Sequence, residues 1–416
     1  MSRSGMRDLG RLSAVALLAG ALVAGCGSGG EEAQEPGGVT TLSLWHFYGP
    51  PESATGGALV RFLQRYEQAH PGVKVEPRHI PFGDFNRTVL QSAAGGELPD
   101  IALIGATSTQ AMAEAGIIED LSDRVAKWGK QDAYLPSIWQ TTQVGGKTYA
   151  LPHVADTYAV YYNTELLDEA GVKPPKTWDE MAETARKLTS GDRQGLAVSG
   201  VEGEEGATAL VIRILAAGGD VTKIDSPAAN KALTQFKQLV DSGAMSKGII
   251  GWNEEDVKNQ FANGRAAMMI NSATYVSTLR KENPDLKWKI ALLPGDTRQV
   301  TFLAAENLAI TSGSSHPDAA WDLMTWMQDP KALAEYLPDR NKLATRDDVP
   351  ADGDEARSVF AEQLKSAWAP SGALAEHSSE VFTHVQGALQ AAISGSATVD
   401  QALAEAQQKI DKTLAE

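Results

Sequence analysis

The spacing of apolar residues predicts alternating strands and helices in the first part of the chain. Residues 41–47 (TLSLWHF) have the composition of a strand. A helix is expected next, because an apolar stripe repeats at i, i+3, i+4 and i+7 through Leu59, Phe62, Leu63 and Tyr66. The pattern then predicts a strand over 73–75, an amphipathic helix over 85–93, and a strand buried on both faces over 101–104.

The same alternation restarts after Gly146. Thr177 and Glu180 form a predicted capping box, in which Thr177 is the N-cap and Glu180 reaches back to its amide. Ser226-Pro227 begins a further helix, with proline at the first helical position. Three segments have the apolar composition of strands: 157–162, 196–199 and 266–270.

This order of elements predicts an α/β protein. Strands that alternate with helices form mostly parallel sheets with right-handed crossovers and helices on both faces. A chain of 416 residues is too long for one hydrophobic core, so two such units are expected. The hydrophobic content of 43% and charged content of 22% are typical of globular proteins.

The N-terminus has the composition of a secretory signal over residues 1–25. Three arginines precede an apolar stretch, 12–24, which is shorter than the roughly 20 residues of a membrane span. The residues before Cys26, the single cysteine, resemble the lipobox of bacterial lipoproteins, in which this thiol carries a diacylglycerol. Two acyl chains suffice for stable anchoring. We therefore expect a lipid anchor on Cys26 at the outer face of the cytoplasmic membrane, followed by a flexible polar linker over 26–38.

Charge and motifs exclude several functions. The net charge of −16 disfavours nucleic acid and anionic lipid as partners. Gly146-Lys147-Thr148 ends like a phosphate loop, but Thr141 stands where its first glycine is required, so a hairpin is expected. His377, Glu380 and His384 have helical spacing but lack further zinc ligands, and we predict no metal and no cofactor.

An ordered series of fragments resembles the extracellular solute-binding proteins of ABC importers, in the carbohydrate-binding group that includes maltose-binding protein. The likeness runs from about Thr40 to the C-terminus. The fragments are Tyr66 with HPGVKV (70–75), LPDI (98–101), GKTYALP (146–152), YYN (161–163), PPKTWDE (174–180) and GRAAM (264–268).

The resemblance implies two α/β lobes with a ligand cleft between them. It places the first lobe at 39–153 plus 303–345 and the second at 156–300 plus 348–416. Three crossings are expected, near 153–156, 300–303 and 343–347. The implied function is that of a monomeric, non-enzymatic receptor that closes by hinge motion on a mono- to oligosaccharide and delivers it to a permease with a separate ATPase.

Candidate binding residues in the first lobe follow from the rule that ligands lie beyond the carboxyl ends of strands. The rule selects 45–48, 81–86 and 105–108. Tyr48 offers a ring that can stack on a sugar, whereas a packing role for Trp45 is equally consistent with the pattern. The candidates are Trp45, His46, Tyr48, Asp84 and Asn86.

Asp156 is expected to accept sugar hydroxyls, because it matches an acidic ligand-binding residue of maltose-type proteins and lies at the first crossing; the alternative is a solvated hinge residue. The remaining candidates are Glu204, Trp252, Tyr275, Phe382, Glu306, Asn307 and Arg346. Trp252 can equally pack under a loop. After Ile270 this chain lacks the Gly-x-Trp pattern of many relatives, and Glu306 adds a carboxylate where relatives have paired glycines, so the sugar identity does not transfer.

Two other functions stay open at this point. A glycerophosphodiester or other polar solute would require cationic groups, and Arg346 is the basic residue expected near a crossing. A glycoside hydrolase would require two carboxylates, such as Asp156 and Glu306, about 5 to 10 Å apart with one pKa raised by burial.

Overall fold

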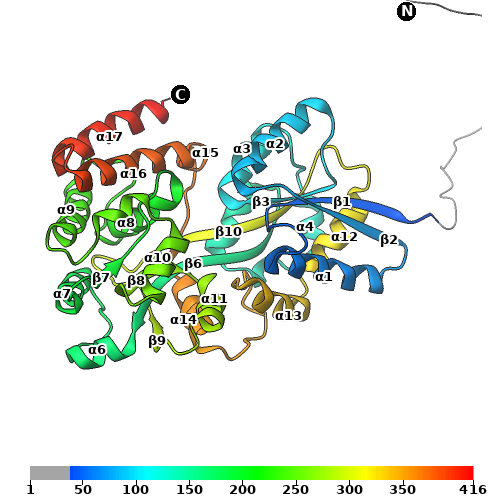
Figure 1. Ribbon diagram of the computed structural model, residues 1–416. Helices are drawn as coiled ribbons and strands as arrows, with labels where there is room; N and C mark the ends of the chain where they lie inside the picture. Colours follow the sequence, from blue (N-terminus) through cyan, green and yellow to red (C-terminus); the bar gives the residue numbers. More distant parts are fainter. Residues whose placement is uncertain (1–37, 416) are drawn as a thin grey trace, which may run out of the picture. The chain divides into compact units, whose positions relative to one another are not determined.

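The computed structural model describes residues 38–415, so the predicted signal, Cys26 and most of the linker lie outside the described residues. One mixed sheet runs through this part of the chain in the order β2-β1-β3-β10-β6-β8-β7, with β9 paired to β6 and β11 to β10 (Figure 1). The strands are β1 Thr40–His46, β2 Val73–His79, β3 Ile101–Gly105, β6 Leu151–Asn163, β7 Gln194–Ala197, β8 Ala266–Ser272, β9 Trp288–Ala291, β10 Thr301–Ile310 and β11 Ala367–Trp368.

The helices cover both faces at each end of this sheet. Their bounds are α1 Ala54–Ala69, α2 Phe82–Gly95, α3 Thr109–Glu114, α4 Ser122–Trp128, α5 Pro136–Trp139, α6 Thr164–Ala170, α7 Trp178–Leu188, α8 Glu204–Ala216, α9 Pro227–Asp241, α10 Glu254–Ala262, α11 Tyr275–Glu282, α12 Pro317–Met327, α13 Pro330–Arg340, α14 Glu355–Leu364, α15 Ala373–Glu376, α16 Ser378–Ser394 and α17 Val399–Thr413. Four 3-10 turns are η1 Ala106–Ser108, η2 Gln131–Ala133, η3 Gln140–Thr142 and η4 Lys247–Gly251.

Four apolar clusters divide the described chain into two lobes. In the first lobe, α1, α12 and α13 cover one face of β1 and β3, and α2 and α3 cover the other. In the second lobe, α7, α8, α9, α16 and α17 share one apolar cluster with β7 and β8, while α10, α11 and α14 share the other. Each lobe therefore has helices on both faces of its part of the sheet, as an α/β fold requires.

Two long strands join the lobes. The first half of β6, Leu151 to Thr157, pairs antiparallel with β10, and its second half pairs with β8 and β9. β10 continues into the first lobe, where it pairs antiparallel with β3. The parallel pairs predicted from the alternation are β1-β2, β1-β3 and β7-β8, whereas the joining strands add antiparallel pairs and make the sheet mixed.

Several local predictions are confirmed, and one is corrected. The two-residue strands Gln143–Val144 and Lys147–Thr148 form the predicted hairpin, and Gly145 and Gly146 at its turn have positive φ angles. Thr177 caps α7 by accepting the amide of Glu180. The Glu180 carboxylate, however, accepts the amide of Lys176 rather than that of Thr177, at 2.7 Å. The cap was therefore predicted correctly and the partner of Glu180 was not.

Candidate functional site

The carboxyl ends of strands from both lobes meet beside the joining strands. β1 leads to Tyr48, β8 leads to Thr274, and Asp156 lies on β6 between them. Asp156 is opposite Ala304 of β10, so it shares a face of the β6-β10 ladder with Glu306, two residues further along that strand. This arrangement is where ligands bind in open α/β sheets.

Six side chains form a junction cluster at this place: Tyr48, Asp156, Thr274, Glu306, Arg340 and Lys342. The Lys342 Nζ atom lies 3.0 Å from Asp156 Oδ2 and 3.6 Å from Glu306 Oε1. The Arg340 guanidinium lies over the ring of Tyr48, 3.4 Å from its centroid, and 4.0 Å from Glu306 Oε2. Sequence reasoning identified Tyr48, Asp156 and Glu306 but missed both cations.

Asp156 is held by protein donors on both carboxylate oxygens. Oδ1 accepts the amides of Thr157 and Ala273 at 2.8 and 2.9 Å. Oδ2 accepts the hydroxyl of Thr274 at 2.7 Å as well as Lys342. The side chain is only 3% exposed. Asp156 therefore positions the start of α11 against the joining strands, and its direct contact with a ligand stays a prediction.

An acidic group lies beside the cluster in the second lobe. The Tyr158 hydroxyl donates to Glu254 Oε1 at 2.5 Å, and Glu205 accepts the amide of Glu254. Burial raises the pKa of Glu254 to about 7. The hydrogen bond from Tyr158 lowers this pKa, whereas the charges of Glu205 and Asp156 raise it further. Burial and the charges of nearby carboxylates, Glu254 foremost, also raise the pKa of Tyr275. These groups can accept and donate several hydroxyl hydrogen bonds.

In the wild type, Glu254 is expected to make the free energy of unfolding fall as pH rises, and Glu254→Gln should remove this fall. Because its pKa of about 7 in the folded protein exceeds the ordinary 4.5, the folded chain holds a proton that the unfolded chain has lost between these pH values. The free energy of unfolding therefore decreases as pH rises from 4.5 to about 7 and this contribution is then constant. Urea denaturation of the wild type, Glu254→Gln and the exposed control Glu169→Gln tests this; an unchanged slope in Glu254→Gln would contradict it.

Four other predicted residues do not join the cluster. Glu204 begins α8, and burial raises its pKa. Trp252 precedes the capping box of α10, and its carbonyl accepts the Ser199 hydroxyl at 2.9 Å. His46 is buried, its Nδ1 accepts the Tyr48 amide at 3.2 Å, and burial lowers its pKa to about 4. Asn307 is buried and donates to Thr109 at 3.0 Å.

Five predicted residues pack in the core or bind other protein groups. Trp45 is in the apolar core of the first lobe, and Phe382 packs against Phe302 in the core of the second. Arg346 is paired with Asp348 through two nitrogens and donates to the Gln328 carbonyl. Asp84 pairs with Arg87 on the exposed side of α2, and Asn86 donates to Ser108 at 2.9 Å. Arg346 is therefore not the basic residue of the junction; Arg340 and Lys342 are.

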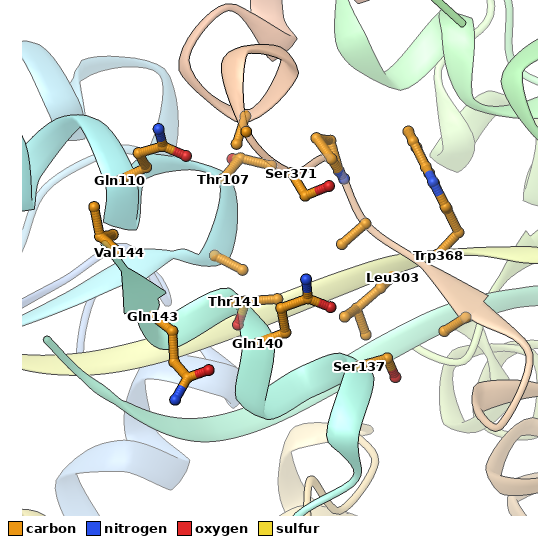
Figure 2. A pocket seen from close by; sticks show the side chains of 16 residues that line it. Thr107, Gln110, Ser137, Gln140, Thr141, Gln143, Val144, Leu303, Trp368 and Ser371 are labelled. Carbon is orange, nitrogen blue, oxygen red and sulfur yellow. The ribbon is translucent and has the colours of Figure 1, made fainter. Parts of the chain in front are cut away.

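A separate cavity of about 300 Å³ lies on the opposite face of the β6-β10 ladder (Figure 2). Leu303 lines it, and this residue alternates with Ala304 and Glu306, which face the junction cluster. In Figure 2, Gln110 and Gln140 of the first lobe lie across from Trp368 and Ser371. None of the thirteen predicted ligand-binding residues lines this cavity, although Ala106 and Thr107 fall in the selected range 105–108.

The sequence of the chain matches a known protein family. A model of the bacterial extracellular solute-binding protein family matches residues 49–334. The chain belongs to this family. In the part of this solute-binding protein that the structure describes, no helix has the length and hydropathy of a membrane span.

Some relatives of this solute-binding protein are named as sugar-binding proteins or are solved with a carbohydrate-like ligand. The multiple sugar-binding protein of Streptococcus mutans is 21% identical over 67% of this chain and 69% of its own. An ABC transporter solute-binding protein of Thermotoga lettingae, solved with α-D-tagatose, is 25% identical with a TM-score of 0.79 and covers 90% of this chain and 100% of its own. The GacH receptor of Streptomyces glaucescens, solved with acarbose, has the same identity and score over 91% and 99%. The fold is thus the two-lobed one of maltose-binding-type proteins, and the chain is the solute-binding component of an ABC transporter.

Proposed function

We propose that this chain captures a carbohydrate between its two lobes and delivers it to the permease of an ABC importer. The observation that carries the proposal is the meeting of strand ends from both lobes at the junction cluster, beside carboxylates and tyrosines that match sugar hydroxyls and ring faces. A lipid on Cys26 would hold the receptor beside its permease. We further propose that the ligand is a mono- to oligosaccharide. The proposed lobes are those predicted from the sequence, 39–153 plus 303–345 and 156–300 plus 348–416.

The charges at the junction favour a neutral ligand over a glycerophosphodiester. An anion needs cationic groups that are available to pair with it. Arg340 and Lys342 both already face Glu306, and Lys342 also holds Asp156. An anionic solute would have to displace these carboxylates, whereas sugar hydroxyls can share the remaining acceptors of Glu205 and Glu254.

A thermal-shift panel with neutral sugars, sugar phosphates and glycerophosphodiesters tests the function. A bound ligand at a hundred times its dissociation constant stabilises the folded protein by about 2.7 kcal/mol. We expect a neutral sugar to raise the unfolding midpoint. If only anionic solutes or none of the sugars did so, the carbohydrate proposal would be wrong. Release of a cleaved product from a bound glycan would instead indicate a hydrolase.

Two variants locate the ligand. Tyr275→Ala removes a half-buried ring at the start of α11 and is expected to lower sugar affinity at least about tenfold, as loss of a stacked aromatic group does. Trp368→Ala removes a half-buried ring from the opposite cavity and is expected to change affinity less than about threefold. Isothermal titration measures both. The reverse ranking would place the ligand in the cavity of Figure 2.

A further inference from the structure

The junction cluster contains one charged group from each segment that joins the two lobes. Asp156 comes from β6, Glu306 from β10, and Lys342 from the segment between α13 and α14. α13 packs in the first lobe and α14 in the second, so this segment is the third crossing. A single ammonium group therefore contacts carboxylates of both other crossings, at 3.0 and 3.6 Å.

The cluster also reaches into each lobe. On one side Arg340 ends α13 and stacks on Tyr48, beyond the end of β1. On the other side the Asp156 carboxylate binds Ala273 and Thr274, immediately before α11. Lys342 lies 3.5 Å from the Thr274 hydroxyl as well. A continuous series of polar contacts thus runs from the end of β1 in the first lobe to the start of α11 in the second.

The charges of the cluster are shielded from solvent and balanced. The exposed fractions of the side chains are 3% for Asp156 and Arg340, 13% for Glu306 and 16% for Lys342. Two cations face two anions. Ion contacts of low exposure are stronger than surface pairs, and removal of one partner leaves an uncompensated charge that costs several times more than a surface pair contributes.

We propose that Lys342 is a hinge lock, which holds the three crossing segments in one relative arrangement in the unliganded protein. Hinge motion changes backbone angles in the segments between lobes, so it must alter the distances from Lys342 to Asp156 and Glu306. The lock regulates the closure assumed in the proposed function. Its test uses no ligand, so failure of the lock and failure of sugar binding are distinguishable.

Loss of Lys342 is expected to release the single lobe arrangement. Asp156 faces Lys342 from β6, Glu306 from β10 and Arg340 from α13, and Glu254 of α10 interacts with it at longer range. Without the ammonium, the carboxylates repel one another with Arg340 as the nearest cation, so they no longer hold the crossing segments together.

Spin labels on both lobes measure the arrangement directly. The single cysteine is replaced by Cys26→Ser, and cysteines are introduced at the exposed positions Gln91 of α2 and Lys187 of α7. Double electron-electron resonance then gives the distance distribution of the unliganded chain. We expect one population in the wild type. Lys342→Met should gain a second population, above about a tenth of the molecules.

Three further variants separate a lock from general damage. Lys342→Arg keeps the charge and should restore the wild-type distribution. Lys342→Met with Glu306→Gln removes one charge of each sign and should have a smaller second population than Lys342→Met. Lys365→Met, an exposed lysine paired with Glu362, should have no effect. A wild-type distribution in Lys342→Met, a second population in Lys342→Arg, or one in the double variant at least as large as in Lys342→Met would overturn the proposal.

Discussion

Asp156→Ala is expected to lower the free energy of unfolding by about 3–5 kcal/mol, because it breaks a buried ion pair from one side. The substitution leaves the Lys342 ammonium, 16% exposed, without its 3.0 Å partner. It also leaves the amides of Thr157 and Ala273 and the hydroxyl of Thr274 without their acceptor. Urea denaturation of the unliganded protein measures the loss.

Asp84→Ala is the matched control for this prediction. Asp84 is also paired with a cationic side chain, that of Arg87, but its own side chain is 50% exposed, so its loss should cost less than about 1 kcal/mol. The sequence assigned Asp156 to sugar binding, and a ligand role alone predicts a different result. If Asp156→Ala unfolded like the wild type and merely failed to bind sugar, the structural role derived from its four donors would be wrong.

Sequence patterns predicted those parts of the fold that depend on residues close together in the sequence. The stripe through Leu59 and Tyr66 corresponds to α1, and the apolar run 101–104 to β3. Ser226 caps α9, with Pro227 at its first position. In each case spacing or a cap determines the element, and no distant contact is needed.

The first half of β6 was missed because its pattern is not that of a strand. The prediction began at residue 157, whereas β6 begins at Leu151 and continues through Pro152 and His153. Both of these residues interrupt the apolar run, and the segment is extended because it pairs with β10. That pairing joins residues about 150 positions apart, so it leaves no local trace.

The candidate site was predicted in outline only. The rule that ligands lie beyond the ends of strands selected Tyr48, which follows a predicted strand. The family resemblance selected Asp156, which lies at the first predicted crossing. Arg340 and Lys342 lie in a polar segment that resembles an ordinary loop, and their importance follows only from the approach of Glu306. The basic pair just before the predicted crossing at 343–347 was the one signal that could have revealed them.

Gly195→Ala is expected to destabilise the second lobe by about 3 kcal/mol, since it forces an atom into the contact between β7 and α7. A Cβ atom on Gly195 would lie 1.8 Å from the carbonyl oxygen of Ala185 and 2.3 Å from its carbon, whereas ordinary contacts exceed 3.4 Å. Both neighbours are backbone atoms of a buried helix, so no rotamer change relieves the overlap. α7 would have to move away from the strand.

Gly387→Ala provides the opposite control. Gly387 lies in the interior of α16, is exposed, and has no atom within 4 Å of the position that an alanine methyl group would take. Alanine there reduces the conformational entropy of the unfolded chain and should stabilise the protein by about 0.5–1 kcal/mol. Chemical denaturation measures both variants. Because β7 leads to the loop before Glu204 and Glu205, displacement of this strand in Gly195→Ala should also weaken sugar binding. A Gly195→Ala protein with wild-type stability and affinity would contradict the close packing of α7 on β7.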